Sequence, residues 1–311
     1  MRRTLALLVA GAVLLTGCGS ASQSASSGTV GRTPAQAREA AAETSATVVA
    51  VGDIACPPGK RRTATTCRQR ATYRQAAALA PNRVIVLGDE QYQKGSYYGF
   101  THSYAKSWGK LRRITWPVPG NHEYYTPGAR GYFRYFKYRS PKAPGYYRRA
   151  LNGWQLYFLN SNCGVIDCAT ERAWLDSEMT ANPATCSAIV FHHPRFSSGG
   201  EHGSSRAMKP FWDIAYRHGA DVALSGHDHD YERFAPMSPD GALDPANGIQ
   251  QFVSGAGGRS LYPQGETVTG SQAFVNTAFG VLALTLRSHS YAWEFRDTTS
   301  TVRDSGSAAC R

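Results

Sequence analysis

Five short segments in the middle of the chain carry side chains that typically bind metal ions. They are Gly52-Asp53-Ile54-Ala55, Gly88-Asp89-Glu90-Gln91-Tyr92, Gly120-Asn121-His122-Glu123, Phe191-His192-His193-Pro194 and Gly226-His227-Asp228-His229. Together they offer carboxylate and amide oxygens, several imidazoles and one phenol. Such mixed nitrogen and oxygen ligation suits ions such as Fe, Zn or Mn. A central carboxylate could bridge two ions, the arrangement used for in-line displacement at phosphorus. The sequence therefore predicts a site for two metal ions.

Each segment follows a short apolar run that predicts a buried strand. These runs are residues 47–51, 83–87, 116–119, 188–191 and 221–224. Polar residues at the C-terminal tips of such strands lie at the edge where open α/β sheets bind ligands. Further strands are predicted at 156–160, 249–253, 279–286 and 290–295, the last two as a hairpin. Helices are predicted at 68–80, from Thr170, and from Ser204 or Ser205 to His218.

The resulting order predicts an α/β fold in which two β-sheets pack together with helices outside. No regular element is predicted for residues 128–149, which are rich in Tyr, Arg, Pro and Gly. The glycines at 255, 257 and 258 are interpreted as a tight turn, with a close approach of the backbone to the metals as the alternative.

Each of the five segments alone is weak evidence for a metal site. Gly-Asp after a strand is often a turn, and a His-x-His pair can arise by chance. Their occurrence once each, in one order and each after a predicted strand, favours a shared site.

In this combination the segments resemble the motif set of the calcineurin-like metallophosphoesterases, and more narrowly that of the purple acid phosphatase branch. The resemblance covers residues 46 to 296. The broader superfamily commonly has a His two residues after the first Asp, where this chain has Ala55. The purple branch instead has a Tyr three residues after the second Asp, and Tyr92 stands there. The resemblance implies a four-layer sandwich of two mixed β-sheets flanked by α-helices.

The resemblance also implies the roles of seven ligands. The first ion would be held by Asp53, Asp89, Tyr92 and His229. The second would be held by Asp89 as the bridge, Asn121, His192 and His227. His192 is preferred to His193 because the family ligand lies two residues before the Pro. A phenolate favours a trivalent ion, so Fe(III) is implied in the first site, with Fe, Zn or Mn(II) in the second.

The activity implied by the resemblance is that of an acid-phosphatase-like hydrolase acting on a small phosphorylated substrate. A metal-bound hydroxide would attack a phosphate monoester in line. His122 and His202 would face the substrate and bind phosphate oxygens or protonate the leaving group. His202 lies ten residues after His192, one residue further than in the animal enzymes of the branch.

Two alternatives stay open. One is a phosphodiesterase or nucleotidase with the same metals. The other is a non-catalytic surface binding lipoprotein, which would be expected to lack a ligand, although all seven are present.

The N-terminus predicts export. Residues 1–17 combine Arg2 and Arg3 with an apolar stretch too short to span a bilayer. Leu15-Thr16-Gly17-Cys18 resembles the lipobox of bacterial lipoproteins, which implies cleavage before Cys18 and lipid attachment to its sulfur. An ordinary secretory signal with a chance Cys is the alternative. The expected location is the cell envelope, lipid-anchored on the outer face of the bacterial cytoplasmic membrane.

Composition separates the remaining chain into two parts. Residues 18–45 are rich in Ala, Ser, Gly and Thr and predict a flexible tether, and residues 46–311 fit one domain. The formal net charge of +12 suits anionic substrates or a position beside anionic headgroups. No nucleic-acid-binding module is recognised, and the oligomeric state is left open.

The cysteine count predicts three disulfides. Six of the seven Cys remain once Cys18 is set aside, an even number outside the cytoplasm. Six Cys allow fifteen connectivities. The preferred pairing joins Cys56 to Cys67 and Cys163 to Cys168, chosen for their short loops, and Cys186 to Cys310. Cys metal ligands are disfavoured because no Cys pair has a two-residue spacer.

Overall fold

The computed structural model of the chain describes residues 44–137 and 144–311. The predicted signal peptide, Cys18 and all but the last two residues of the predicted tether lie outside the described residues. Within the described ranges, no helix is both long and apolar enough to cross a membrane.

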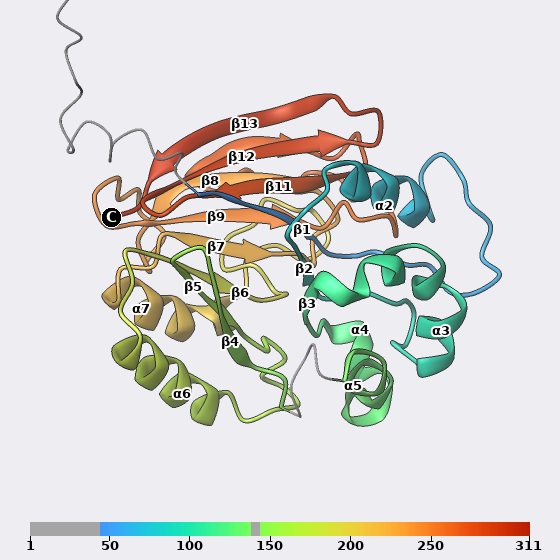
Figure 1. Cartoon of the computed structure of the whole chain (residues 1–311), viewed down its shortest axis with the longest axis horizontal. Coiled ribbons are helices and arrows are strands. Elements are labelled where there is room, and N and C mark those ends of the chain that lie inside the picture. The colour runs from blue at the N-terminus through green and yellow to red at the C-terminus, as the bar shows by residue number, and fades with distance from the viewer. Residues whose placement is uncertain (1–43, 138–143) are drawn as a thin grey trace, which may run out of the picture. The chain divides into compact units, whose positions relative to one another are not determined.

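The fold is built on two β-sheets (Figure 1). The first sheet has, in spatial order, β13 (Val302–Ala309), β12 (Ser290–Asp297), β11 (Gly280–Leu286), β1 (Ala46–Val51), β2 (Arg83–Leu87) and β3 (Thr115–Val118). The second has β10 (Ser271–Val275), β8 (Tyr231–Met237), β9 (Ile249–Ser254), β7 (Val222–Ser225), β6 (Cys186–Val190), β5 (Trp154–Phe158) and β4 (Tyr147–Leu151). Parallel strands β1–β2–β3 and β5–β6–β7–β9 stand beside antiparallel neighbours, so both sheets are mixed.

Helices cover the outer faces of both sheets. The elements packed beside the first sheet are α2 (Gln69–Ala78), α3 (Tyr97–His102), η1 (Tyr104–Lys106), η2 (Trp108–Ile114), α4 (Asn121–Tyr124), η3 (Pro127–Ala129) and α5 (Arg130–Phe136). The second sheet is covered by α6 (Cys168–Ala181) and α7 (Lys209–Arg217), with η4 (Arg206–Met208) before α7. Figure 1 shows α6 and α7 beside β4 to β7, and α2 to α5 gathered on the side of β1 to β3. The predicted four-layer arrangement is therefore confirmed.

Burial on both faces explains why the parallel strands are uniformly apolar. In β1, Val48 and Ala50 belong to the core between the two sheets, whereas Val49 and Val51 belong to the core under the helices. Strands covered on both faces are continuous hydrophobic runs rather than alternating ones. This property made the strands that lead into the five segments recognisable from sequence.

Residues 128–149, to which no regular element was assigned from the sequence, contain in their described part the end of η3, helix α5 and the start of β4. Tyr132, Tyr135 and Phe136 of α5 are buried, and Tyr135 and Phe136 pack against Phe100 of α3. The apolar face of α5 consists mainly of aromatic side chains interleaved with Arg and Gly, which hides its helical period.

Two helix starts and three strands also differ from the predictions. Helix α6 begins at Cys168 rather than Thr170, because the Asp167 side chain accepts hydrogen bonds from the first turn. Helix α7 begins at Lys209 rather than at Ser204 or Ser205, because the short helix η4 follows Ser205 and precedes α7. Strands β8, β10 and β13 were not predicted. Most of β13 is exposed, so it lacks the apolar run of a buried strand.

All three preferred disulfides are present. Cys56 bonds to Cys67, Cys163 to Cys168 and Cys186 to Cys310. The third closes a separation of 124 residues and ties β6 of the second sheet to the chain end that follows β13 of the first.

Candidate metal centre

The structure brings the seven predicted ligands together where parallel strands end. Asp53 and Asp89 follow β1 and β2, and Asn121 begins α4 after β3. The histidines come from the second sheet, with His192 after β6 and His227 and His229 after β7. Because the C-terminal tips of parallel strands meet at one edge of each sheet, residues far apart in sequence converge.

One cluster contains the ligands predicted for the first ion. The Tyr92 hydroxyl lies 2.8 Å from Asp53 Oδ1 and 2.9 Å from His229 Nε2. His229 Nε2 is 3.4 Å from Asp53 Oδ1. The other ring nitrogen of His229, Nδ1, is 2.9 Å from Ser260 Oγ, so Nε2 is the atom turned toward the cluster.

A second cluster contains the ligands predicted for the second ion. His192 Nε2 lies 3.1 Å from Asn121 Oδ1, 3.1 Å from His227 Nδ1 and 3.5 Å from Asp89 Oδ1. Asp53, Asp89 and His192 form one group with potential ligand atoms within 4.8 Å of one another. Asp89 therefore lies between the ligands of both clusters, as a bridging carboxylate requires.

The donor chemistry of the second cluster fits a cation. His192 Nδ1 donates a hydrogen bond to Leu87 O at 2.7 Å, which leaves a lone pair on Nε2 in the neutral ring. That lone pair faces the carbonyl oxygen of Asn121 and a carboxylate oxygen of Asp89, neither of which can donate in this state. Such convergence of acceptors is stable only with a proton or a metal ion between them.

The pKa values of Asp89, His192 and Tyr92 also indicate that the centre requires a positive charge. Burial acts to raise the pKa of Asp89, but the adjacent imidazoles, His192 first, outweigh it and the pKa is lowered. Burial lowers the pKa of His192, but the charge of Asp89 reverses this and raises it to about 9. Burial, then the carboxylates of Asp53 and Asp89, raise the pKa of the Tyr92 phenol well above its usual value. A phenolate at Tyr92 thus requires a compensating cation.

Three ligands have a backbone conformation that is unusual for residues with side chains. Asp53, Asp89 and His227 have φ values of 60°, 49° and 76°. Left-handed φ at non-glycine residues costs about 1–3 kcal/mol each and persists where the surrounding structure enforces it. Strained backbone at three ligands is consistent with a functional site.

Glu123 organises the centre, a role that sequence reasoning did not assign. Its buried carboxylate accepts hydrogen bonds from the backbone N–H groups of Asp89, Gly120 and Gln91 at 2.9, 2.9 and 3.3 Å. It thereby ties the loop after β2 to the loop after β3. A Cβ added to Gly120 would lie 2.1 Å from Asp89 Oδ1, so this close approach requires glycine.

Both histidines predicted to face the substrate lie at the centre. His122 Nε2 is 3.8 Å from Asp89 Oδ2, and its ring packs against Tyr92. His202 is exposed, and its ring stacks on His227 with centroids 4.0 Å apart. The spacing of His202 in the sequence therefore does not keep it from the site.

His193 also lies among the metal-binding histidines. Its Nδ1 is 2.7 Å from Ser161 Oγ, and its ring is 4.4 Å from that of His227. Burial, followed by the charge of His192, lowers its pKa to about 3. With His192 and His227 it forms the second group that could hold an ion, so the structure places both histidines of this segment at the centre.

The acidic residues after His227 contact a loop rather than the ligand imidazoles. Asp228 accepts hydrogen bonds from Ser197 Oγ and from the backbone N–H groups of His202 and Gly203. Glu232 accepts from Ser198 N at 2.8 Å. These carboxylates therefore position the loop that carries His202.

The glycines at 255–258, interpreted from the sequence as a tight turn, allow close packing of two backbone segments. Gly257 donates a hydrogen bond to Gly52 O at 3.1 Å, and a Cβ on Gly257 would lie 2.0 Å from that oxygen. The segment thus packs its backbone directly on the loop that carries Asp53.

The chain belongs to the calcineurin-like phosphoesterase family, whose pattern it matches over residues 46–231. This span includes all seven predicted ligands. The family is one of hydrolases that cleave phosphate esters.

Curated relatives point to one part of that family. The chain is 26% identical over 140 residues to acid phosphatase A of Cryphonectria parasitica, covering 43% of this chain and 25% of that protein. It is 28% identical over 137 residues to an acid phosphatase of Aspergillus ficuum, covering 38% and 22%. The chain therefore matches about a quarter of the length of these relatives.

Solved structures show the same fold at low sequence identity. Purple acid phosphatase PPD1 from yellow lupin superposes with a TM-score of 0.70 at 17% identity, covering 86% of this chain and 54% of that one. A dimetal phosphatase from Danio rerio superposes with a TM-score of 0.58 at 12% identity, covering 85% of this chain and 99% of that one. GAP50, named as the anchor in the inner membrane complex of Plasmodium, superposes with a TM-score of 0.61 at 13% identity, covering 86% of this chain and 89% of that one. The fold thus also occurs in a protein named for anchoring, and function must be argued from the site.

Proposed function

We propose that this protein is a two-metal phosphomonoesterase of the acid phosphatase type. The observation that carries the proposal is the position of Asp89 between two ligand clusters that also contain a phenol, an amide and three imidazoles. Fe(III) in the first site and Fe, Zn or Mn(II) in the second are the ions that this donor set would suit.

The residues divide the work as follows. Asp53, Tyr92 and His229 would hold one ion, and Asn121, His192 and His227 the other, with Asp89 shared. Ions bound there would supply Lewis-acid stabilisation of the phosphoryl oxygens and a water of lowered pKa. His122 and His202 stand at the rim of the centre, where an imidazolium can donate to a phosphate oxygen or to the leaving alkoxide.

A groove beside the second cluster offers room for the organic part of a substrate. It encloses about 400 Å³ and is lined by Asn121, His193, Tyr124, Tyr125 and Val165 among others. Tyr125 and Val165 expose 59% and 62% of their surface. This partly aromatic and partly apolar lining supports an ester whose alcohol carries an aromatic or apolar group.

A phosphodiesterase is the second candidate, because the same metal centre serves both reactions and the groove is open. The lipid anchor at Cys18 and a position on the outer face of the bacterial cytoplasmic membrane complete the proposal. They are supported by the sequence of residues 1–18 alone.

The test compares kcat/KM for an aryl phosphomonoester and a bis-aryl phosphodiester on the metal-loaded chain. Asp89→Asn is the blank, and Asp213→Asn, a matched change on the surface of α7, is the control. A strong monoester preference, abolished in Asp89→Asn together with metal binding and kept in Asp213→Asn, is expected. A diester preference would reassign the enzyme as a phosphodiesterase. Rates equal to the blank on both esters would overturn the enzymatic proposal and favour a binding protein.

A further inference from the structure

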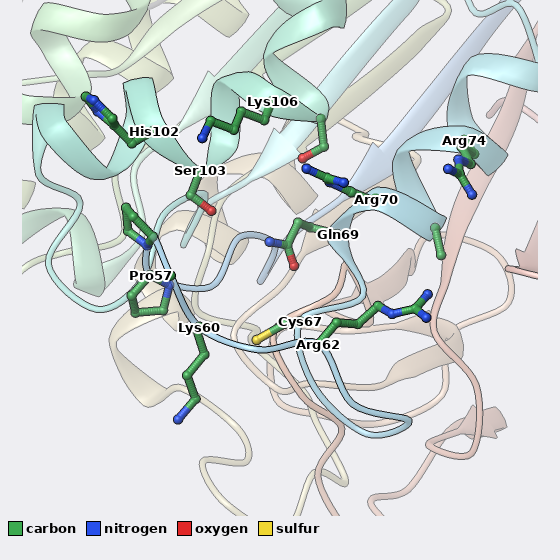
Figure 2. A pocket seen from close by; sticks show the side chains of 14 residues that line it. Pro57, Lys60, Arg62, Cys67, Gln69, Arg70, Arg74, His102, Ser103 and Lys106 are labelled. Atoms are coloured by element: carbon green, nitrogen blue, oxygen red, sulfur yellow. The ribbon is translucent and has the colours of Figure 1, made fainter.

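A second pocket, outside the predicted metal ligands, is lined mainly by polar and cationic residues, together with Pro57, Pro58 and Ala71. It encloses about 380 Å³, within the range of small-molecule sites. Its walls come from the loop between Cys56 and Cys67, from the first turns of α2, and from the segment that runs from the end of α3 through η1 to Ser107. Figure 2 shows the side chains of these three segments around it. No residue predicted to bind metal or to face the substrate contributes to the lining.

The pocket concentrates positive charge without compensation. The cationic or potentially cationic residues that line it are Lys60, Arg62, Arg70, Arg74, Lys106 and His102. Among the residues that the structure describes, no aspartate or glutamate lines it. Within residues 44–137 and 144–311, none of the six side chains forms an ion pair. Five permanently charged side chains thus line one cavity without an ion-pair partner among the described residues.

Helix α2 adds to this positive potential. Its first turn contains no acidic residue, and no side chain caps its N-terminus. Arg70 is the second residue of the helix, where the helix dipole disfavours a cation. Arg70 and Arg74 are four residues apart, a spacing at which like charges repel on a helix surface. A bound anion would relieve both unfavourable terms.

The floor of the pocket is rigid. The Cys56–Cys67 disulfide closes the loop, and the Ser103 hydroxyl donates to Cys56 O at 2.7 Å. The backbone N–H groups of Cys67 and Arg68 donate to Arg259 O and Gly258 O at 3.3 and 2.8 Å. In a preformed site, ordering the side chains and the loop costs less free energy when a ligand binds.

We propose that this pocket binds a polyanion that carries phosphate groups, independently of the metal centre. Guanidinium groups match phosphate oxygens in a bidentate geometry. The loop and α2 contribute cations to the pocket, and the segment that bears Lys106 contributes another. Cations on several walls suit a ligand with more than one anionic group. The phosphates come either from a soluble oligophosphate or from the headgroups of an anionic lipid surface.

The first arm of the experiment is calorimetric titration of tripolyphosphate into the chain, with metal removed by a chelator so that metal-held phosphate does not contribute. The second arm is cosedimentation with phosphatidylcholine vesicles, with and without phosphatidylglycerol. Both arms compare the unsubstituted chain with Arg70→Ala/Arg74→Ala. The matched control is Arg113→Ala/Arg130→Ala, which removes two exposed charges that do not line the pocket.

We expect the pocket variant to weaken binding by about 10-fold, the combined effect of two exposed charge contacts, and the control to leave it unchanged. The binding should also weaken as salt is added. Arg70 and Arg74 are exposed, so thermal unfolding without ligand should not change, which separates lost binding from lost folding.

Loss in the tripolyphosphate arm would establish a soluble phosphate ligand, and loss only in the phosphatidylglycerol arm would establish a lipid headgroup. No binding in either arm, or equal loss in both double variants, would overturn the proposal.

Discussion

Ser260 offers a test of the metal centre that touches no predicted ligand. Its hydroxyl lies 2.9 Å from His229 Nδ1, and in the tautomer that binds a metal through Nε2 it accepts the hydrogen bond that Nδ1 donates. Nε2 then presents its lone pair toward Tyr92 and Asp53. Ser260→Ala removes this constraint without changing charge or any ligand atom.

The expected magnitude follows from the role of such orienting hydrogen bonds. Their loss typically lowers metal affinity about 10- to 100-fold, which corresponds to about 1.4–2.7 kcal/mol. Tyr262 stacks on His229 with centroids 3.9 Å apart and continues to restrain the tilt of the ring, so the lower half of this range is expected. Without metal, the free energy of unfolding should fall by about 1 kcal/mol at most.

The assay is competition for the metal with a chromophoric chelator, followed by thermal unfolding at fixed free metal. Metal-dependent stabilisation should decrease by the same free energy as the binding, and only one of the two sites should weaken. Ser300→Ala is the matched control, because it removes a hydroxyl that bonds to Gln75 instead. Unchanged affinity in Ser260→Ala, or an equal loss in Ser300→Ala, would refute the assignment of His229 Nε2 as a ligand oriented by Ser260.

Three further predictions concern the scaffold. Cys186→Ala/Cys310→Ala opens a loop with a separation of 124 residues and should cost about 5 kcal/mol in urea unfolding; a cost below about 1 kcal/mol would contradict the loop-entropy argument. Burial raises the pKa of Glu171 to about 8, so the native state binds the extra proton and stability falls as pH rises from about 4.5 to about 8. Glu171→Gln should flatten this part of the pH profile and stabilise the chain at pH 8 by on the order of 5 kcal/mol; an unchanged slope in thermal melts would disprove it. Gly120→Ala places a Cβ against Asp89 Oδ1. It should lower the free energy of unfolding by about 1–3 kcal/mol and weaken metal binding in a chelator competition. A metal affinity equal to that of the unsubstituted chain would show that the two loops can separate.

The sequence predicted the fold where local pattern and tertiary environment agree. The strands β1, β2, β6 and β7 are buried on both faces, so each is a short apolar run followed by a polar tip. Strand β13 and helix α5 escaped prediction because the first is exposed and the second buries aromatic residues among Arg and Gly. In both, the surroundings rather than the local pattern determine the conformation.

The chemistry of the site divides in the same way. The sequence by itself determined which side chains could bind metal and in what order, because ligand type is a property of each residue and each predicted ligand follows a recognisable strand or turn. Only the tertiary structure decided which nitrogen of His229 faces the centre, that Glu123 joins two loops, and that Asp228 holds the loop of His202. The cationic pocket also emerged only from the fold, since Lys60, Arg70 and Lys106 belong to three separate segments. Hydrogen bonds and electrostatic interactions between segments far apart in the chain depend on their distances in the folded structure, which the order of residues does not reveal.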